Sequence, residues 1–424
     1  MATYDSYKDS GVKWIGPIPS HWEVKQLRAY FERRNRRVSD KDFAPLSVTK
    51  NGIVPQLENV AKSKDNDNRR LVKVGDFVIN SRSDRKGSSG VSELEGSVSF
   101  VNTIMMPSDN ILSSFCNYLL KSHGFVEENY RNGHGIAADL WTTSYDEQKF
   151  IKLAVPPVSE QQAIVAYLDE ETGKIDRAIE AHRQMIDALN ERKQIIITRA
   201  VTRGINPDAP LRDSGIPWLG QIPKHWEMRP LRHTFEMRNG YTPSKADPTL
   251  WGGNIPWYRM EDIRKTGRFL NESIDRVTKK ALGAKGTFKA GSYILAICTA
   301  SIGEHAMQIA DSQANQQFAN LKIRKSLEHR RQPMFIFYYM FVVGDYCRDN
   351  ANSTCFQYVD MAALKNFLVP IPPVEEQNVI VDYLVNGTKE VEEALLNCER
   401  MISLLQERKQ IIINEVVTGK KKVI

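Results

Sequence analysis

The chain has 424 residues, of which 41% are hydrophobic, and a formal net charge of +7 from 58 Lys and Arg against 51 Asp and Glu. This composition is typical of a globular protein of two or three domains, and it excludes a disordered chain. The longest apolar run, Met334 to Val343, has ten residues, about half the length of a membrane-spanning helix.

The N-terminal segment MATYDSYKDS is polar and acidic, unlike a secretory signal or a transit peptide. The five cysteines form no CxxC pair and no even set for a disulfide framework. We therefore expect a reduced, cytoplasmic protein without a membrane segment. The small positive charge permits an anionic partner but does not establish one.

The first recognisable segment is DSGVKWIGPIPSHWEVKQLR at 9–28, and it returns as DSGIPWLGQIPKHWEMRPLR at 213–232. At this offset of 204, His21-Trp22 aligns with His225-Trp226. We expect these pairs to fix the entrance of a domain by packing. None of the eight histidines has HxH or HxxxH spacing with nearby acids, so we expect no metal site.

A variable body follows each opening motif. The segment LVKVGDFVINSRS at 71–83 resembles TFKAGSYILAICT at 287–299 in the second body. Each has a glycine turn before a β-favouring apolar run, which predicts a strand. Polar loops that contain Gly and Ser separate such runs, so we predict that each body is a mixed α/β domain.

A helical segment follows each body. PPVSEQQAIVAYL at 156–168 matches PPVEEQNVIVDYL at 372–384, and ERKQIII at 191–197 matches ERKQIII at 407–413, both at an offset of 216. In both segments apolar residues recur at a spacing of three and four, which predicts a long helix with one apolar seam. The seam includes Ile175, Ile179, Ile186, Leu189 and Ile196 in the first segment and Val391, Leu395, Ile402, Leu405 and Ile412 in the second.

The two seams share one register, and an apolar seam on a polar helix requires a partner. We therefore expect the two helices to form a coiled coil. Internal duplication favours a pseudo-twofold, antiparallel arrangement. The alternative is that each helix packs only on its own domain. We also expect Gly173 and Gly387 to break the segments, with Thr172 and Thr388 capping the long helices.

The repeats divide the chain into four parts. A first variable domain occupies 1–155, a first helical region 156–205, a second variable domain 206–371 and a second helical region 372–424. Because the two offsets differ, the second body is 12 residues longer than the first.

Signatures of catalysis are missing from the sequence. Gly133 to Ala138 fits the dinucleotide pattern GxGxxA, but it follows a polar stretch and not a strand. The sequence contains no GxxxxGK[ST] phosphate loop and no Asn-Pro-Pro-Tyr methyltransferase motif. The two nuclease-like Glu-x-Lys strings, at 191–193 and 407–409, lie in the seam helices and are expected to be surface charges. We expect no catalytic residue and no cofactor in this chain.

The bodies instead carry side chains that suit nucleic acid. Lys and Arg neutralise phosphates, and polar side chains beside them can read base edges. Basic residues of the first body are Arg33, Arg34, Arg36, Arg37, Arg82, Arg85 and Lys86. Polar and basic candidates in short loops are Lys50 and Asn51, then Thr242, Ser244 and Lys245.

The paired motifs DSG-x2-WxGxIPxHWE and PP-x2-EQ-x2-IV-x-YL, each ahead of ERKQIII, resemble the specificity subunit of a type I DNA restriction–modification system. The resemblance covers essentially the whole chain. It implies two target-recognition domains, each reading half of a split DNA site, held apart by two long antiparallel helices. It also implies a non-catalytic subunit that binds DNA adenine methyltransferase subunits, expected to be two, and restriction subunits. S-adenosylmethionine, ATP and Mg²⁺ would then belong to those partners.

The resemblance also implies DNA-facing loops ahead of each PPV motif, at 133–144 and 352–360, and a further loop around 252–263 in the second half. Candidate contacts in these loops, and at the end of the second predicted strand, are His134, Trp141, Thr142, Tyr258, Arg259, Thr299, Ser301, Thr354, Gln357 and Tyr358. The sequence does not reveal which bases are read.

The length of the seam fits this function. From Ile175 to Ala200 there are 25 helical steps, about 38 Å, close to one turn of B-DNA at about 34–36 Å. Two alternatives stay open: a self-contained methyltransferase or nuclease, and a coiled-coil adaptor that binds no DNA. Salt-dependent binding to duplex DNA separates such an adaptor from a DNA-recognition subunit.

Overall fold

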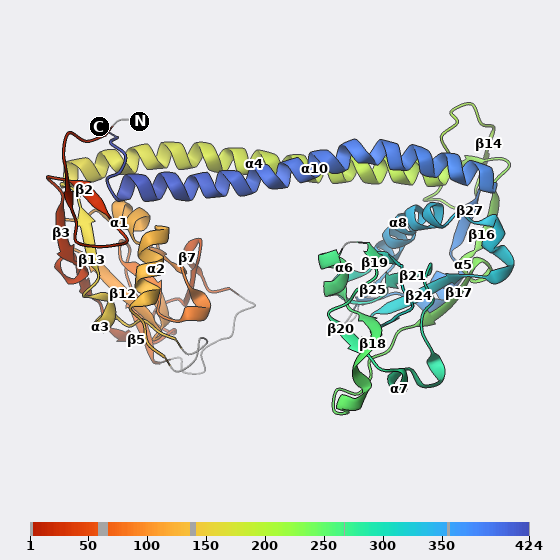
Figure 1. Ribbon diagram of the computed structural model, residues 1–424, viewed down its shortest axis with the longest axis horizontal. Coiled ribbons are helices and arrows are strands. Elements are labelled where there is room, and N and C mark those ends of the chain that lie inside the picture. Colours follow the sequence, from red (N-terminus) through yellow and green to blue (C-terminus); the bar gives the residue numbers. More distant parts are fainter. Residues whose placement is uncertain (1–2, 58–66, 136–140, 267, 354–356, 424) are drawn as a thin grey trace. The chain divides into compact units, whose positions relative to one another are not determined.

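The computed structural model describes residues 3–57, 67–135, 141–266, 268–353 and 357–423 (Figure 1). The chain divides into two compact units, one formed by residues 1–183 with 398–424 and the other by residues 184–397. Each unit holds one body and one part of each long helix, α4 (Val158–Arg203) and α10 (Val374–Val417). The predicted α/β class with two long helices is therefore confirmed. The finer domain boundaries stay a prediction.

Unit 1 contains a four-stranded sheet in the order β10–β9–β12–β4 and a three-stranded sheet in the order β11–β8–β5. The strands of these sheets are β4 (Phe31–Arg33), β5 (Arg37–Val38), β8 (Arg69–Val72), β9 (Phe77–Asn80), β10 (Ser89–Val91), β11 (Gly96–Ser99) and β12 (Asn102–Pro107). Shorter pairs are formed by β1 (Tyr7–Asp9) with β2 (Pro17–Pro19), β3 (Glu23–Gln26) with β13 (Lys152–Val155) and β6 (Leu46–Thr49) with β7 (Gly52–Pro55). The helices of the body are α1 (Ser113–Leu119), α2 (His123–Arg131) and α3 (Tyr145–Gln148).

Unit 2 contains a five-stranded sheet in the order β17–β24–β21–β22–β19 and a three-stranded sheet in the order β20–β18–β23. The strands are β17 (Phe235–Asn239), β18 (Trp251–Tyr258), β19 (Phe269–Leu270), β20 (Asp275–Val277), β21 (Tyr293–Ala296), β22 (His305–Gln308), β23 (Gln313–Ala314) and β24 (Phe318–Ile323). Three shorter pairs are β14 (Leu211–Asp213) with β15 (Gln221–Pro223), β16 (Glu227–Pro230) with β27 (Leu368–Ile371) and β25 (Asn352–Ser353) with β26 (Gln357–Tyr358). The helices are α5 (Leu231–Thr234), α6 (Met260–Thr266), α7 (Lys279–Leu282), α8 (Pro333–Asp349) and α9 (Met361–Asn366).

The two bodies share one framework, although their sequences share only faint landmarks. Three strands of unit 1 have a counterpart 216 residues later, the offset of the PPV motifs: β9 matches β21, β10 matches β22 and β12 matches β24. Strand β4 matches β17 at the offset of the opening motifs, which is 204 residues. Equivalent strands also pair in the same order within each sheet. The additional residues of the second body therefore lie between β17 and β21. The predicted glycine-turn strands are confirmed, since Gly75 and Gly291 both adopt positive φ before β9 and β21.

Within each unit the two long helices pack antiparallel. In unit 1 the first part of α4 packs against the last part of α10, and Asp176 pairs with Lys409 at 2.7 Å. In unit 2 the last part of α4 packs against the first part of α10, and Lys193 pairs with Glu392 at 2.5 Å. The two ion pairs are equivalent residues of the repeat. The predicted pseudo-twofold pairing is therefore confirmed, and the ends of the helices also enter the cores of the bodies.

Several predicted seam residues pack in the core of their unit, Ile175, Ile179, Ile402, Leu405 and Ile412 in unit 1 and Ile196 in unit 2. Ile175, Ile179, Val391 and Ile412 are buried, and Ile186, Leu189, Ile196, Leu395, Ile402 and Leu405 are half-buried. Burial is deepest where a body adds a third layer to the pair.

The expected breaks at Gly173 and Gly387 were wrong. Both long helices continue through these positions. The hydroxyls of Thr172 and Thr388 do not cap a new helix but donate to the carbonyls of Leu168 and Leu384, one turn back, at 2.7 and 2.8 Å. A glycine costs about 1 kcal/mol inside a helix, less than the continued packing of the seam returns.

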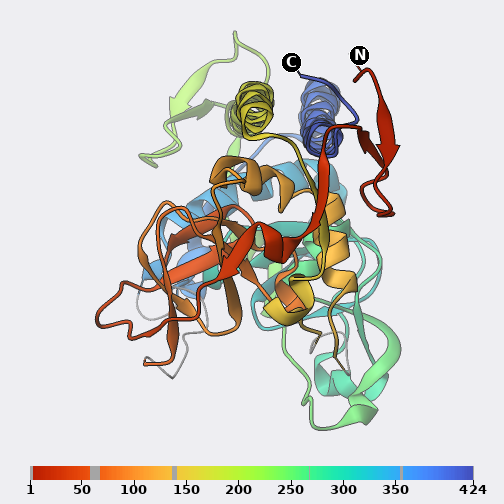
Figure 2. The same cartoon turned by 90° about the vertical axis from the view of Figure 1, so that its left-hand side faces the viewer.

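The end of α10 closes the body of unit 1. Gly419 has positive φ and lies against Pro19 and Trp22 of the opening motif, as Gly204 lies against Pro223 and Trp226 in unit 2. Figure 2 shows the N-terminal hairpin beside the C-terminal end of α10. The apolar run of α8 lies in the core of unit 2. Among the helices of the described ranges, none combines the length and apolar character needed to cross a bilayer.

Candidate nucleic-acid interface

The loops with predicted contacts leave the framework sheet at one edge. In unit 1 the end of β9 pairs with the start of β12, with Asn80 opposite Asn102. In unit 2 the end of β21 pairs with the start of β24, with Ala296 opposite Phe318. Antiparallel pairing thus places the segments after β9 and before β12 at one edge, and the same holds for β21 and β24.

The segment ahead of each PPV motif is held at this edge by matching backbone bonds. In unit 1 the amide of Thr143 donates to the carbonyl of Ser81 at 2.9 Å, and in unit 2 the amide of Val359 donates to the carbonyl of Ile297 at 2.8 Å. Isolated bridges join Arg82 to Thr142 and Cys298 to Tyr358. Each pair of bonds is equivalent under the repeat.

A groove of about 630 Å³ opens beside this edge in unit 1. Its walls come from the β6–β7 hairpin, the segment after β9 and the turn between β11 and β12. Three predicted contacts, Lys50, Arg82 and Arg85, line it together, and Asn51 is exposed at the tip of the hairpin. Asp84 lies 3.4 Å from Arg82 and 3.7 Å from Arg85. The three exposed cations outnumber this carboxylate, so the groove favours an anionic ligand.

The cluster predicted at 33–37 separates into different roles. The guanidinium of Arg34 donates to Asp76 at 2.7 and 3.0 Å, and this hydrogen-bonded pair raises the pKa of Arg34. Asp76 is only 3% exposed, whereas the side chain of Arg34 is 21% exposed, so Arg34 is anchored in the body and its contact with DNA stays a prediction. Arg33 is half-buried over the ring of Tyr145, whereas Arg36 and Arg37 are exposed.

Other predicted residues of the first body hold the loops in place. Lys86 pairs with Glu127 at 2.7 Å and lies over the ring of Tyr130. The indole N–H of Trp141 donates to the carbonyl of Tyr130 at 2.8 Å. His134 lies 3.4 Å from Glu147, and its backbone pairs with that of Thr142.

In unit 2 the loop after β17 is folded onto its neighbours. The hydroxyl of Thr242 donates to the side chain of Gln316, and Ser244 accepts from the indole N–H of Trp251 at 3.0 Å through its carbonyl. Lys245 is exposed. Thr242 and Ser244 are thus engaged within the unit, whereas the ammonium of Lys245 is accessible to a ligand.

The segment around 252–263 differs from its prediction in one residue. Tyr258 is 0% exposed, and its ring lies in the core with Phe288 and Phe318. Its prediction as a DNA contact is corrected, because the end of β18 is buried on both faces, with Trp257 and Tyr258 3% and 0% exposed. Arg259 is half-buried and lies 3.3 Å from Asp275.

The remaining predicted residues of unit 2 lie beside one another at the sheet edge. Gln357 and Tyr358 are exposed, and Thr299 and Ser301 are half-buried in the segment after β21. Thr299 has φ of +69°, a left-handed conformation that side chains with a branched Cβ rarely adopt. The strain is held by the bridge from Cys298 to Tyr358. Thr354 lies outside the described residues.

Sequence reasoning missed the carboxylates that join each opening motif to a long helix. Glu160 is 5% exposed and accepts from Tyr4 at 2.5 Å and from the indole N–H of Trp22 at 3.1 Å. His21 Nε2 lies 2.7 Å from the same carboxylate. Burial is the largest cause that raises the pKa of the Tyr4 hydroxyl, followed by its bond to Glu160.

The second half repeats this arrangement. Glu376 lies 2.7 Å from His225 Nε2 and accepts from Trp226 at 3.0 Å. The neighbouring Gln161 and Gln377 accept from the amides of Leu112 and Gln332. The signal for these residues was the Glu-Gln pair present in both PPV motifs.

The fold and the repeated edge can now be set beside known proteins. A family model described as the type I restriction modification DNA specificity domain matches residues 223–398. The type I restriction enzyme EcoprrI specificity subunit of Escherichia coli is 41% identical over 147 residues, which span 34% of this chain and 36% of that protein. A protein of Methanocaldococcus jannaschii named for the type I restriction enzyme MjaX specificity subunit is 22% identical, with 98% of both chains covered.

The second variable region and the start of the second long helix thus match a type I specificity domain, and nearly the whole chain is similar to a type I specificity subunit. A solved structure from work on complex assembly and conformational transition of the type I R-M system has the same fold, with a TM-score of 0.66 at 15% identity over 94% of this chain and 98% of that chain. These similarities favour a specificity subunit over a self-contained methyltransferase, a nuclease or an adaptor that binds no DNA.

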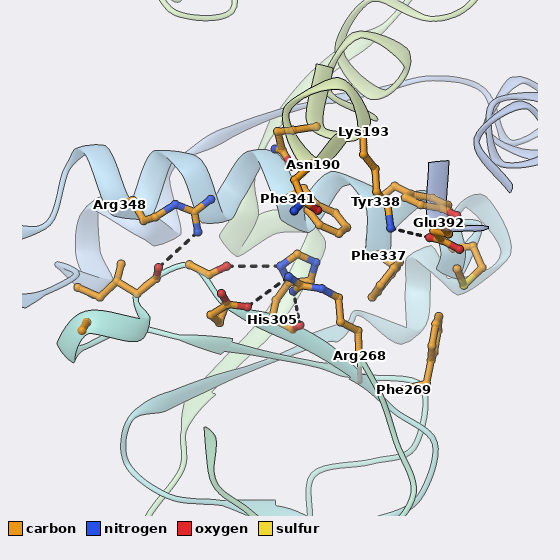
Figure 3. Close-up of a pocket in the computed structure, with 16 residues that line it drawn as sticks. Asn190, Lys193, Arg268, Phe269, His305, Phe337, Tyr338, Phe341, Arg348 and Glu392 are labelled. Atoms are coloured by element: carbon orange, nitrogen blue, oxygen red, sulfur yellow. Dashed lines mark hydrogen bonds and ion pairs between the residues drawn. The ribbon is translucent and has the colours of Figure 1, made fainter. Parts of the chain in front are cut away.

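A second cavity lies in unit 2, and its side chains are poorly suited to catalysis. It measures about 770 Å³ and lies between α8, the segment before β22 and side chains of the long helices (Figure 3). Its charged groups pair with one another, Lys193 with Glu392 at 2.5 Å and Arg268 with Glu304 at 3.2 Å. His305 is an inadequate acid or base, because burial and then Arg268 lower its pKa to about 3. We assign no reaction to this cavity.

Within the described ranges, no three His, Cys, Asp or Glu side chains are grouped to hold a metal ion. Of the cysteines in these ranges, Cys116, Cys347 and Cys398 are buried, and burial raises the pKa of the Cys116 and Cys347 thiols. Neither thiol is placed to act as a nucleophile.

Proposed function

We propose that each body of this specificity subunit reads one half of a bipartite DNA site. The observation that carries the proposal is the shared framework, on which unlike loops gather at the same sheet edge. A common scaffold with different loops suits two readers that approach DNA alike and recognise different bases. The basic groove of unit 1 supplies both phosphate-binding cations and amides that suit base edges.

The proposed contacts are the predicted residues whose side chains stay accessible. In unit 1 they are Arg36, Arg37, Lys50, Asn51, Arg82 and Arg85, with Arg33, Lys86, His134, Trp141 and Thr142 shaping or flanking the loops. In unit 2 they are Thr242, Ser244, Lys245, Arg259, Thr299, Ser301, Gln357 and Tyr358. Thr354 stays a proposal from sequence. The proposed domains keep the boundaries 1–155, 156–205, 206–371 and 372–424.

The helical pair is proposed to set the spacing between half-sites. The 25 steps from Ile175 to Ala200 correspond to about 38 Å, and paired seams resist bending better than one helix. A matched insertion of seven residues between Ile186 and Ile196 and at the equivalent place in α10 preserves the heptad register. It adds about 10 Å, so we expect a spacer longer by about three base pairs. An unchanged spacer would defeat this part of the proposal.

The long helices are also proposed to dock two methyltransferase subunits. Met185 and Ile195 of α4 are 52% and 58% exposed in unit 2, and their repeat equivalents Met401 and Ile411 of α10 are 42% and 48% exposed in unit 1. Equivalent apolar positions left open on both helices suit two copies of one partner. Restriction subunits complete the proposed complex.

Chemistry is proposed to reside in those partners. S-adenosylmethionine would bind the methyltransferase subunits, and ATP with Mg²⁺ the restriction subunits. The chain itself is proposed to hold no cofactor and to act in the cytoplasm, where its DNA and partners are found. The charge pairing in the large cavity of unit 2 supports a non-catalytic subunit.

Salt-dependent binding tests the proposal. The chain with its methyltransferase subunits should bind duplex DNA with an affinity that falls steeply between about 50 and 200 mM salt. The methyltransferase subunits alone are the matched control, and they should lose sequence preference. Equal preference with and without this chain would contradict the proposal.

A further inference from the structure

An aromatic side chain stands on the wall of the groove of unit 1. Phe100 is 51% exposed and occupies the turn between β11 and β12. The turn is closed by Asn102, whose side-chain amide donates to the carbonyl of Ser99 at 2.9 Å. The ring is therefore presented by a short, hydrogen-bonded turn.

The turn and the basic loop of the groove share one anchor. The amide of Ser81 donates to the carbonyl of Val101 at 3.3 Å, and the carbonyl of Ser81 accepts from Thr143 at 2.9 Å. The hydroxyl of Ser81 also lies 3.2 Å from that of Thr103. Because Arg82 follows Ser81 directly, the aromatic ring and the cation are held in a fixed relation.

The surroundings of Phe100 are basic and rich in amides. Lys50, Arg82 and Arg85 line the groove together with Asn80, Gln56 and Asn102. Single exposed apolar residues are ordinary on a protein surface. Phe100 differs because it lies in a concave groove among phosphate-binding and base-reading groups.

The second body has a polar residue at the equivalent position. Gln316, the counterpart of Phe100 at the offset of the PPV motifs, accepts a hydrogen bond from Thr242. The turns before β12 and β24 occupy the same place in the framework. The two bodies therefore differ in polarity at one position of the proposed interface.

We propose that Phe100 contacts the C5-methyl group of a thymine in the major groove and so specifies an A·T pair in the first half-site. The inference rests on the proposed function. The methyl group is the apolar feature of the base edges in the major groove, and aromatic and aliphatic side chains recognise it there. Lys50, Arg82 and Arg85 position the duplex through its phosphates while the ring discriminates thymine from cytosine.

Deoxyuridine provides the probe, because it keeps the base pair and removes only the methyl group. The complex of the full chain with its methyltransferase subunits is titrated with duplexes in which each thymidine of the first half-site is replaced in turn. We expect one replacement to weaken binding about three- to fivefold, the cost of one lost methyl contact. F100A should bind the thymidine duplex with a similar loss and be insensitive to that replacement.

Phe150 is a matched control. It is also 51% exposed in unit 1, but its ring faces Arg28 and Lys149 and it does not line the groove. F150A should keep the penalty for deoxyuridine. Two further variants test the contact if F100A does not fold. F100L retains an apolar side chain, and F100Q introduces the side chain that the second body has at this position.

Two results would overturn the inference: no replacement weakens binding by the unaltered chain, or both F100A and F100Q retain the penalty. In either case a bipartite methylation motif would leave the proposed function standing. If binding does not depend on this chain at all, the proposed function fails as well. The two failures are thus distinguishable.

Discussion

The two bodies of the chain have the same framework strands but stabilise them by different means. In unit 1 the residue before β9 is Asp76, which binds Arg34 through two hydrogen bonds. The equivalent residue in unit 2 is Ser292, which accepts from the side-chain amides of Gln308 and Asn320 at 2.9 and 2.8 Å. One body uses a buried ion pair where the other uses a neutral network. The framework therefore depends on the pairing of strands and tolerates different side-chain solutions within it.

The junctions between the opening motifs and the long helices differ in how deeply their carboxylates are buried. The carboxylate of Glu160 contacts the polar atoms of Tyr4, His21 and Trp22, and its side chain is 6% exposed. The carboxylate of Glu376 contacts those of His225 and Trp226, and its side chain is 24% exposed. Loss of a buried, multiply bonded carboxylate costs more than loss of a partly solvated one. The two junctions are thus the strongest point of comparison for mutation.

The largest effect is expected from E160A. It leaves three donors without their acceptor, and we expect a loss of about 3–4 kcal/mol in the stability of unit 1. E376A should cost about 1–2 kcal/mol in unit 2. Hydrogen exchange resolved by peptide measures each unit separately. Equal losses would show that the additional donor and the deeper burial of Glu160 contribute nothing.

The second effect concerns the ion pair and the neutral network. D76N should destabilise unit 1 by about 2 kcal/mol, because it weakens a charge-assisted pair and leaves Arg34 partly uncompensated. S292A should cost about 1 kcal/mol in unit 2. The same exchange measurement reports both variants. A larger loss in S292A than in D76N would reverse the comparison.

The third effect is on DNA. R82A and R85A should each reduce the slope of log affinity against log salt by about 0.9 if each contacts one phosphate. Affinity should fall several-fold without altering preference at the second half-site. R28A, on the cation–π pair with Phe150, is the control outside the groove. A slope unchanged in both groove variants would remove this groove from the proposed interface.

The fourth effect concerns the strained backbone of Thr299 and its cost to the stability of unit 2. T299G should relieve the left-handed backbone and stabilise unit 2 by about 1 kcal/mol. T299A keeps the Cβ and should not gain this stability. We also expect T299G to weaken discrimination at the second half-site, since the loop becomes less rigid. Unchanged discrimination would show that the strained conformation has no role in reading DNA.

The smallest effect is expected in the ion pairs of the helices. K193A and K409A remove equivalent pairs whose carboxylates, Glu392 and Asp176, are 53% and 56% exposed. Exposed pairs contribute about 0–1 kcal/mol, so both variants should unfold within that range of the unaltered chain. Thermal unfolding of the complex measures this. A loss well beyond that range in either variant would mean that the pairs fix the register of the helices.

The sequence predicted the elements that depend on local pattern. The 3-4 spacing predicted both long helices and their seams, and the glycine turns at Gly75 and Gly291 predicted the strands that follow them. These patterns are local because helix and strand periodicity places side chains on a face within one segment.

Long-range partners account for what the sequence did not predict. Arg34 stood in a basic cluster, but its partner Asp76 lies far along the chain, directly before β9. Tyr258 ends a strand whose burial is set by its neighbours in the sheet. Glu160 binds the opening motif at the far end of the first body, and only the repetition of its Glu-Gln pair hinted at a role. At Gly173 the local cost of a glycine is visible in the sequence, whereas the packing that offsets this cost is not.

The central claim is tested most directly by mapping methylated bases in DNA from cells that express this chain with its methyltransferase subunits. We predict a motif in two parts separated by unspecified bases, with F100A altering the first part alone and T299G the second alone. A continuous motif, or one that does not change when either body is altered, would contradict the account.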